Sequence, residues 1–278
     1  MGKNFTILVD PGPLSTIPIL HNELTAKGVK RIDYILLTHI HIDHAGGAGA
    51  LLKEFPKARV ICHPDGIRHM TSPEKLWQGS RKVLGNLAEA YGEIIPIPAE
   101  KIGYEETIGQ TGIRVFLTPG HAQHHCSYLL DDLLFAGELA GNYYRISDSF
   151  FMRPATPPRF ILQVALDSID KMIELAPRTM VFAHYGVTDE AMKYLRIARN
   201  QLLLWVKGVA ANILLEKSER EKAIADWLLQ RDEHYRNASL LPQDIMVRER
   251  YFLGNTLRGL IEYVEGLPIE EQQRLVEG

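Results

Sequence analysis

The sequence has few of the features that mark secreted or membrane proteins. Its two cysteines, Cys62 and Cys126, both follow apolar residues, so we expect buried free thiols and no disulfide framework. The longest apolar runs, such as residues 202–206, are too short to cross a bilayer. Residues 1–6 lack the apolar stretch of a signal peptide. We therefore expect a cytoplasmic protein with no membrane partner.

The chain also has no large excess of charge of either sign. The chain has 31 lysine and arginine residues against 34 aspartate and glutamate residues, which gives a formal net charge of −3. This balance produces no strong field toward nucleic acid, so we expect no nucleic-acid partner. What the chain does have is an apolar share of 46% over 278 residues. That is enough for one large domain, or for one domain plus an appendage.

The first two thirds of the chain contain both strands and helices. Short apolar strands alternate with helices predicted at 16–27 and 45–55. From residue 104 to 136, short strands, one of them predicted at 126–130, are joined by tight turns. This pattern indicates an α/β (α+β) fold class.

The last third is predicted to be helical. The strand signal ends at Gly186, and helices are predicted at 188–215, from Ser218 onward and at 244–264. Ser218 and Glu221 have the spacing of a capping box. We expect two parts, which are a domain at 1–187 and a helical extension at 188–278 that packs on it.

Residues 141–158 are predicted to form a long loop without regular structure, because each proline between 154 and 158 removes a backbone donor. Long loops in compact domains often carry function. Tyr143, Tyr144 and Arg153 would then be able to contact a substrate, and the arginine would suit a carboxylate or phosphate. The alternative is a solvated arginine with the tyrosines packed under the loop.

Three histidines and an aspartate directly follow one predicted strand. His39 and His41 are two residues apart in an extended segment, so both imidazoles point to one side and can share a metal ion. Asp43 and His44 come next, as the chain turns toward a helix, and they can face a second ion. The alternative is a polar turn that is rich in histidine by chance. So many ligand-type side chains after one apolar strand argue against it.

Other candidate ligands stand just past the ends of other predicted strands. These candidates are His121, Glu138 and His184, and each has a glycine within two residues. Any one alone would be an ordinary loop residue. Their repeated placement indicates a site, because ligands bind at the carboxyl ends of strands in open α/β sheets.

These motifs resemble those of the metallo-β-lactamase superfamily, over roughly residues 5–187. The resemblance rests on the run His39-x-His41-x-Asp43-His44 and on the order and spacing of His121, Glu138 and His184. It implies a four-layer αββα sandwich with two metal ions in a groove at one edge. By this resemblance, the ligands of one ion would be His39, His41 and His121. Those of the other would be Asp43, His44 and His184, and residue 138 would bridge the two.

The sequence departs from the family pattern in two places. The bridging residue is usually aspartate, whereas Glu138 has one more methylene, so it can bridge, bind one ion only or leave the cluster. The strand that ends at Val9 is usually preceded by further strands, whereas residues 2–4 resemble the tail of a hairpin turn. Either an edge strand is missing or the sequence begins late. An unpaired edge would favour a homodimer.

The resemblance implies hydrolysis of a small-molecule ester, thioester, lactone or amide by a metal-bound hydroxide. Two divalent ions would lower the pKa of a shared water, while Asp43 would orient it and relay a proton. Nitrogen and carboxylate ligands without thiolate suit Zn²⁺ and tolerate Fe or Mn. One alternative is an iron-dependent redox enzyme that acts on a sulfur substrate. The other is a nucleic-acid-processing hydrolase, which the near-neutral charge disfavours.

Neighbours of the ligands are expected to hold the imidazoles in place. Asp10, His124 and His125 are candidates for this role, as is His63. For His63 we favour ordinary packing.

Overall fold

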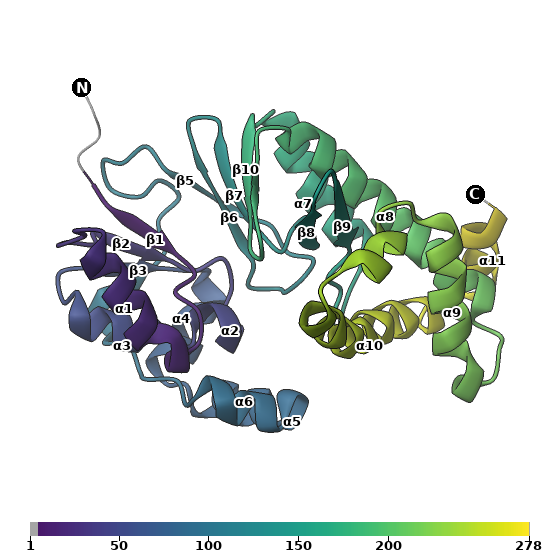
Figure 1. Cartoon of the computed structure of the whole chain (residues 1–278), viewed down its shortest axis with the longest axis horizontal. Coiled ribbons are helices and arrows are strands. Elements are labelled where there is room, and N and C mark those ends of the chain that lie inside the picture. Colours follow the sequence, from purple (N-terminus) through teal and green to yellow (C-terminus); the bar gives the residue numbers. More distant parts are fainter. Residues whose placement is uncertain (1–4, 278) are drawn as a thin grey trace. The chain divides into compact units, whose positions relative to one another are not determined.

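The computed structural model describes residues 5–277, so the hairpin turn expected at residues 2–4 lies outside the described residues. The described chain forms two compact units (Figure 1). The N-terminal unit comprises residues 5–117 and 124–131, and the C-terminal unit comprises residues 118–123 and 132–277. The division into units therefore does not fall at residue 187, where the sequence pattern changes.

A parallel four-stranded sheet is the framework of the N-terminal unit. In pairing order its strands are β1 (Ile7–Val9), β2 (Tyr34–Leu36), β3 (Arg59–Ile61) and β4 (Ile102–Gly103). Most of their residues are aliphatic, as is usual for parallel strands that are covered on both faces. The register sets Val9 opposite Leu36 and Leu36 opposite Ile61. Asp10 and the loop after β2 therefore begin at the same edge of the sheet.

Helices of the N-terminal unit only partly follow the predictions. They are α1 (Ile17–Ala26), α2 (Ile42–Ala45), α3 (Ala48–Glu54), α4 (Pro64–Thr71), α5 (Glu74–Leu84) and α6 (Asn86–Tyr91). The helix predicted at 16–27 is confirmed as α1. The helix predicted at 45–55 is divided at Gly46 and Gly47 into α2 and α3.

An antiparallel pair of strands completes this unit. β5 (Arg114–Leu117) pairs with β6 (Cys126–Leu130), which has the bounds that the sequence predicts. The N–H of Cys126 donates to the carbonyl of Thr38 at 2.6 Å. The hydroxyl of buried Tyr128 donates to the carbonyl of Leu37, also at 2.6 Å. These bonds hold the segment that follows β2.

Two parallel strands of the C-terminal unit end side by side, and a third strand pairs with one of them. β7 (Leu133–Gly137) is parallel to β10 (Thr179–Phe182), and β11 (Val187–Thr188) is antiparallel to β10. Because Phe182 lies opposite Gly137, the chain leaves β7 and β10 at one edge. β11 lies beyond Gly186, so the prediction that strands end there was wrong.

The prediction of an irregular loop at 141–158 was also wrong over most of its length. β8 (Asn142–Ile146) and β9 (Ser149–Arg153) form an antiparallel hairpin with a two-residue connection. The prolines begin only at residue 154, just after β9, so they end the hairpin rather than prevent it. Gly141 precedes β8 with a positive φ of 76°, and a Cβ there would collide with the carbonyl of Arg153.

The helices of the C-terminal unit are α7 (Leu162–Glu174), α8 (Ala191–Asn212), α9 (Lys217–Arg231), α10 (Gln243–Glu265) and α11 (Ile269–Glu277). α8 packs against the other four. The capping box predicted at Ser218 is wrong, because α9 begins at Lys217 and has Glu216 as its N-cap, without a side-chain cap bond. No helix among residues 5–277 is long and apolar enough to cross a membrane.

Candidate metal centre

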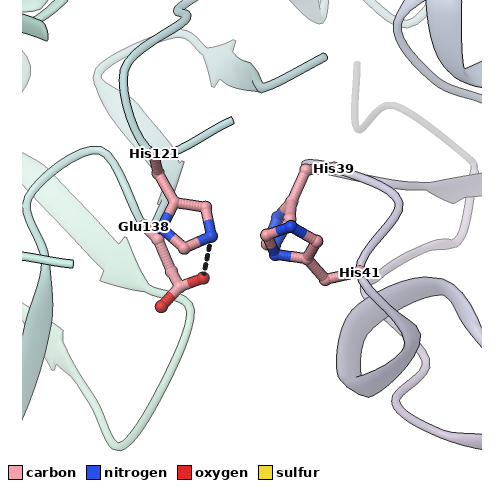
Figure 2. Close-up of side chains that lie close together, drawn as sticks. All are labelled: His39, His41, His121 and Glu138. Atoms are coloured by element: carbon pink, nitrogen blue, oxygen red, sulfur yellow. Dashed lines mark ion pairs between the residues drawn. The ribbon is translucent and has the colours of Figure 1, made fainter. Parts of the chain in front are cut away.

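The loop after β2 brings the first group of predicted ligands together within the N-terminal unit. The ring centroid of His39 lies 4.5 Å from that of His41 and 4.1 Å from that of His44 (Figure 2 shows the first pair). His41 is the N-cap of α2, and Asp43 lies in its first turn. An Oδ of Asp43 is 3.5 Å from Nε2 of His44. The start of helix α2 therefore brings the side chains of Asp43 and His44 close to those of the two histidines before it.

Asp10 orders this group from the end of β1. Its Oδ1 accepts from the N–H of Thr38 at 2.8 Å, and its Oδ2 accepts from the Thr38 hydroxyl at 2.6 Å. The same Oδ2 lies 3.0 Å from Nδ1 of His44. Asp10 has a φ of +47°, a conformation that aspartate and asparagine adopt more readily than other residues with side chains. The expected role of Asp10 in holding the imidazoles is confirmed.

These contacts fix which ring nitrogen carries the proton. Because a carboxylate only accepts, Nδ1 of His44 is the donor to Asp10, and Nε2 keeps its lone pair. The hydroxyl proton of Thr38 is directed at Asp10, so Thr38 accepts from Nδ1 of His39, 3.0 Å away. Both imidazoles then carry a proton on Nδ1, which is the usual tautomer of histidines that bind a metal through Nε2.

The remaining histidines of this unit differ in role. The ring of His124 lies 5.7 Å from that of His41, and the buried ring of His125 lies 5.5 Å from that of His39. His63 instead caps α4 by accepting from the N–H of Asp65 at 3.1 Å, which confirms ordinary packing. Burial lowers the pKa of His63, and the nearby Asp65 partly offsets this effect.

Glu138 is the centre of a second group, in the C-terminal unit. Its Oε2 pairs with Nε2 of His121, the dashed line in Figure 2, at a distance of 2.8 Å. Its Oε1 lies 3.8 Å from Nε2 of His184. Nδ1 of His121 donates to the carbonyl of Ala155 at 3.0 Å. With its proton on Nδ1, a neutral His121 directs a lone pair at the carboxylate, which is favourable only if a cation or a proton lies between them.

The residues present fit a metal centre. Imidazole nitrogens and carboxylate oxygens are the ligands in both groups, and Zn²⁺, Fe and Mn accept such donors. Neither cysteine belongs to these groups. Burial raises the pKa of Cys62 to about 12 and raises that of Cys126 as well, so both thiols stay protonated.

Two of the three residues predicted to contact a substrate are buried in the structure. Arg153 is 1% exposed, and its guanidinium donates to Glu249, Thr256 and the carbonyl of Pro154. Tyr143 is also buried and stacks on Phe182 with a centroid distance of 4.4 Å. Neither side chain is accessible to a substrate.

Tyr144 remains a candidate for substrate contact. It is half-buried, and its ring lies 4.9 Å from that of Tyr185, which directly follows His184 and is 42% exposed. The structure therefore keeps one of the three predicted contact residues close to a predicted metal ligand.

The sequence analysis missed Glu249 and Asn142. Glu249 is a buried carboxylate on α10, and Asn142 lies beside Glu138 at the start of β8. One signal was present, since Glu249 is in helical phase with Thr256 and Leu260, both of which are buried. A charged residue on the buried face of a helix needs a partner.

A family profile, a sequence relative and a solved structure all resemble this chain over most of its length. The profile of the Metallo-beta-lactamase superfamily matches residues 2–184. The metallo-beta-lactamase fold-containing protein ST1585 of Sulfurisphaera tokodaii is 33% identical over 233 residues, which cover 78% of this chain and 85% of that protein. The crystal structure of ST1585 superposes with a TM-score of 0.67 at 28% identity, over 94% of this chain and 90% of that chain.

A hydrolase of named substrate is similar over a shorter segment. Hydroxyacylglutathione hydrolase of Stenotrophomonas maltophilia is 31% identical over 134 residues, or 48% of this chain. The match spans 40% of that protein's length. The likeness is therefore confined to part of each chain.

Proposed function

The chain belongs to the metallo-β-lactamase superfamily, and on that premise we propose that this metal-dependent hydrolase uses two metal ions to cleave a small ester, thioester, lactone or amide. Its α/β fold class with C-terminal helices agrees with that family. The observation that carries the proposal is the group of histidines after β2 that Asp10 orders. Asp10 lies 3.0 Å from Nδ1 of His44, and Thr38, which Asp10 holds, lies 3.0 Å from Nδ1 of His39.

The proposed ligand assignment follows the family pattern. By that pattern, His39, His41 and His121 would hold one ion. Asp43, His44 and His184 would hold the other, and Glu138 would be a ligand of both. The contacts of Glu138 with both His121 and His184 support this role, because one carboxylate oxygen is directed toward each histidine. Zn²⁺ suits this set, and Fe or Mn is compatible with it.

Bound divalent ions would supply a water that is acidic enough to attack at neutral pH, together with polarisation of the scissile carbonyl. Asp43 would orient the attacking water, accept its proton on a carboxylate oxygen and pass the proton to the leaving group. The Asp43 side chain is 30% exposed, which leaves it accessible to a substrate and to water. Tyr144 would pack against the substrate.

The substrate class is a small molecule with an activated carbonyl. The likeness to hydroxyacylglutathione hydrolase supports a thioester among the candidates, over the half of this chain that the match covers. Esters, lactones and amides also have an electrophilic carbonyl carbon and are the other candidates.

Metal content and hydrolysis test the proposal together. Protein purified without chelator and reconstituted with Zn²⁺ should contain about two ions per chain by elemental analysis. It should hydrolyse at least one member of a panel of thioesters, esters, lactones and amides, and His41→Ala should be the inactive control. A metal content near zero after reconstitution would refute the proposal. Iron in the purified protein with redox turnover and no hydrolysis would also refute it.

A further inference from the structure

A buried ion pair joins the C-terminal helix α10 to the end of β9. Nε of Arg153 donates to Oε2 of Glu249 at 2.7 Å, and both side chains are buried. Nη1 of Arg153 also donates to the carbonyl of Pro154 at 2.9 Å and to Oγ1 of Thr256 at 3.1 Å. The guanidinium is therefore fixed in position and neutralised by one carboxylate.

Asn142 links this ion pair to Glu138. In the orientation that satisfies both neighbours, the amide oxygen accepts from Nη2 of Arg153 at 2.8 Å. The amide nitrogen then donates to Oε1 of Glu138 at 3.1 Å. Arg153 selects this orientation, because the reversed amide would direct N–H groups at the guanidinium and an oxygen at the carboxylate.

We propose that Glu249 is a positioning residue for the metal centre, which acts through Arg153 and Asn142 on the carboxylate of Glu138. The contact with Asn142 constrains Oε1. Oε2 then stays at its position 2.8 Å from Nε2 of His121. This proposal rests on the proposed function, since it requires Glu138 to be a metal ligand.

Because the side chain of Glu138 is long, contacts that restrict the position of its carboxylate should matter for metal binding. Glutamate has one more rotatable bond than aspartate, so its carboxylate reaches more positions and loses more freedom when it is fixed. A donor held in place beside one oxygen limits those positions before the metal binds. Preorganised ligands of this kind depend on side chains whose own contacts are satisfied.

A purely structural role for the ion pair leads to a different expectation. If the Arg153–Glu249 pair only fastens β9 to α10, its loss should lower stability and leave the metal affinities unchanged. If it positions Glu138, its loss should selectively weaken the ion that depends on this carboxylate. Asp232 provides a matched control, because it is a buried carboxylate of the same unit that accepts from Gln201 and Trp205.

The test measures the two Zn²⁺ dissociation constants of the full chain by competition with a chromogenic chelator. Glu249→Gln and Asn142→Ala should each raise one of the two constants by about tenfold or more, the usual effect of losing a residue that orients a metal ligand. The double variant should lose little more than either single variant, because both act along one path. Asp232→Asn should leave both constants within about twofold of the parent value.

Each other outcome overturns the proposal in a recognisable way. Unchanged constants in Glu249→Gln and Asn142→Ala, while Glu138→Gln weakens one ion, would reject the positioning role and leave the proposed function intact. An equal loss in Asp232→Asn would show that general destabilisation is the cause. A parent protein that binds no Zn²⁺ would reject both proposals. If Glu249→Gln does not fold, Asn142→Ala decides the question, because Asn142 is only half-buried.

Discussion

Replacing Asp10 with asparagine should impair metal binding by changing one atom. Asparagine is tolerated at a φ of +47°, so the backbone need not move. With its oxygen retained on the N–H of Thr38, the new amide nitrogen faces Nδ1 of His44. Two donors cannot share a hydrogen bond, so His44 must move its proton to Nε2, the atom that would otherwise ligate the metal.

The size of the effect follows from the contacts that are lost. Losing a residue that orients a metal ligand costs about 10- to 100-fold in affinity, or about 1.4–2.8 kcal/mol. The metal-free protein also loses a charge-assisted hydrogen bond from the Thr38 hydroxyl at 2.6 Å and another from Nδ1 of His44 at 3.0 Å. Taking about 2 kcal/mol for these together, the melting temperature should fall by about 4–8 °C.

Two measurements check this prediction. Chelator competition gives the Zn²⁺ dissociation constants, and thermal unfolding in excess chelator gives the stability of the metal-free protein. Asp33→Asn is the control, because Asp33 also accepts a backbone N–H, from Thr6 at 2.8 Å, in the same unit. It should lower stability without weakening Zn²⁺ binding. Zn²⁺ affinities of Asp10→Asn within about twofold of the parent would refute the tautomer argument.

His41→Ala should remove activity and lower the melting temperature in the presence of Zn²⁺ but not in excess chelator, since a metal ligand stabilises only the folded state; equal melting temperatures with Zn²⁺ would contradict this. Glu138→Gln should weaken one ion selectively and Glu138→Asp should do so less, and unchanged dissociation constants in Glu138→Gln would exclude bridging. Burial raises the pKa of Cys62 from 9.0 to about 12 and raises that of Cys126 too. The thiols therefore contribute stability that is complete below pH 9 and is lost toward pH 12, so the free energy of unfolding in urea should fall more steeply above pH 9 than in a variant with both cysteines changed to alanine. The edge strand β1 and exposed side chains such as Leu214, which is 96% exposed, predict a homodimer, and light scattering that detects only monomer at micromolar concentration would count against it.

The sequence predicts the site well where its parts are local. His39, His41, Asp43 and His44 lie within one short run after a strand, so their proximity follows from the chain itself. Asp10 could also be found, because it directly follows a predicted strand. The bounds of β6 were predicted for the same reason, since an apolar run between turn residues is a local signal.

The errors come from contacts between distant parts of the chain. The sequence predicts that Arg153 lies in a loop and either contacts a substrate or is solvated, because a sequence window shows only a charged residue before a proline. Its partner Glu249 is 96 residues away, and only the fold brings the two together. The hairpin of β8 and β9 escapes prediction for a different reason, because the prolines that follow it give the whole segment the composition of a loop.

The buried polar contacts also decide how the C-terminal helices should be regarded. Gln201 on α8 donates to the carbonyl of Met152 in β9 at 2.8 Å and to Asp232 at 2.8 Å. Arg153 in β9 pairs with Glu249 on α10. Separating the helices from the strands would leave these groups buried without partners, or would expose the apolar surface around them, and either change is costly. The helices after residue 187 therefore belong to the unit that contains Glu138, His121 and His184, and their loss should disturb that group of ligands even though none of the three lies on a helix.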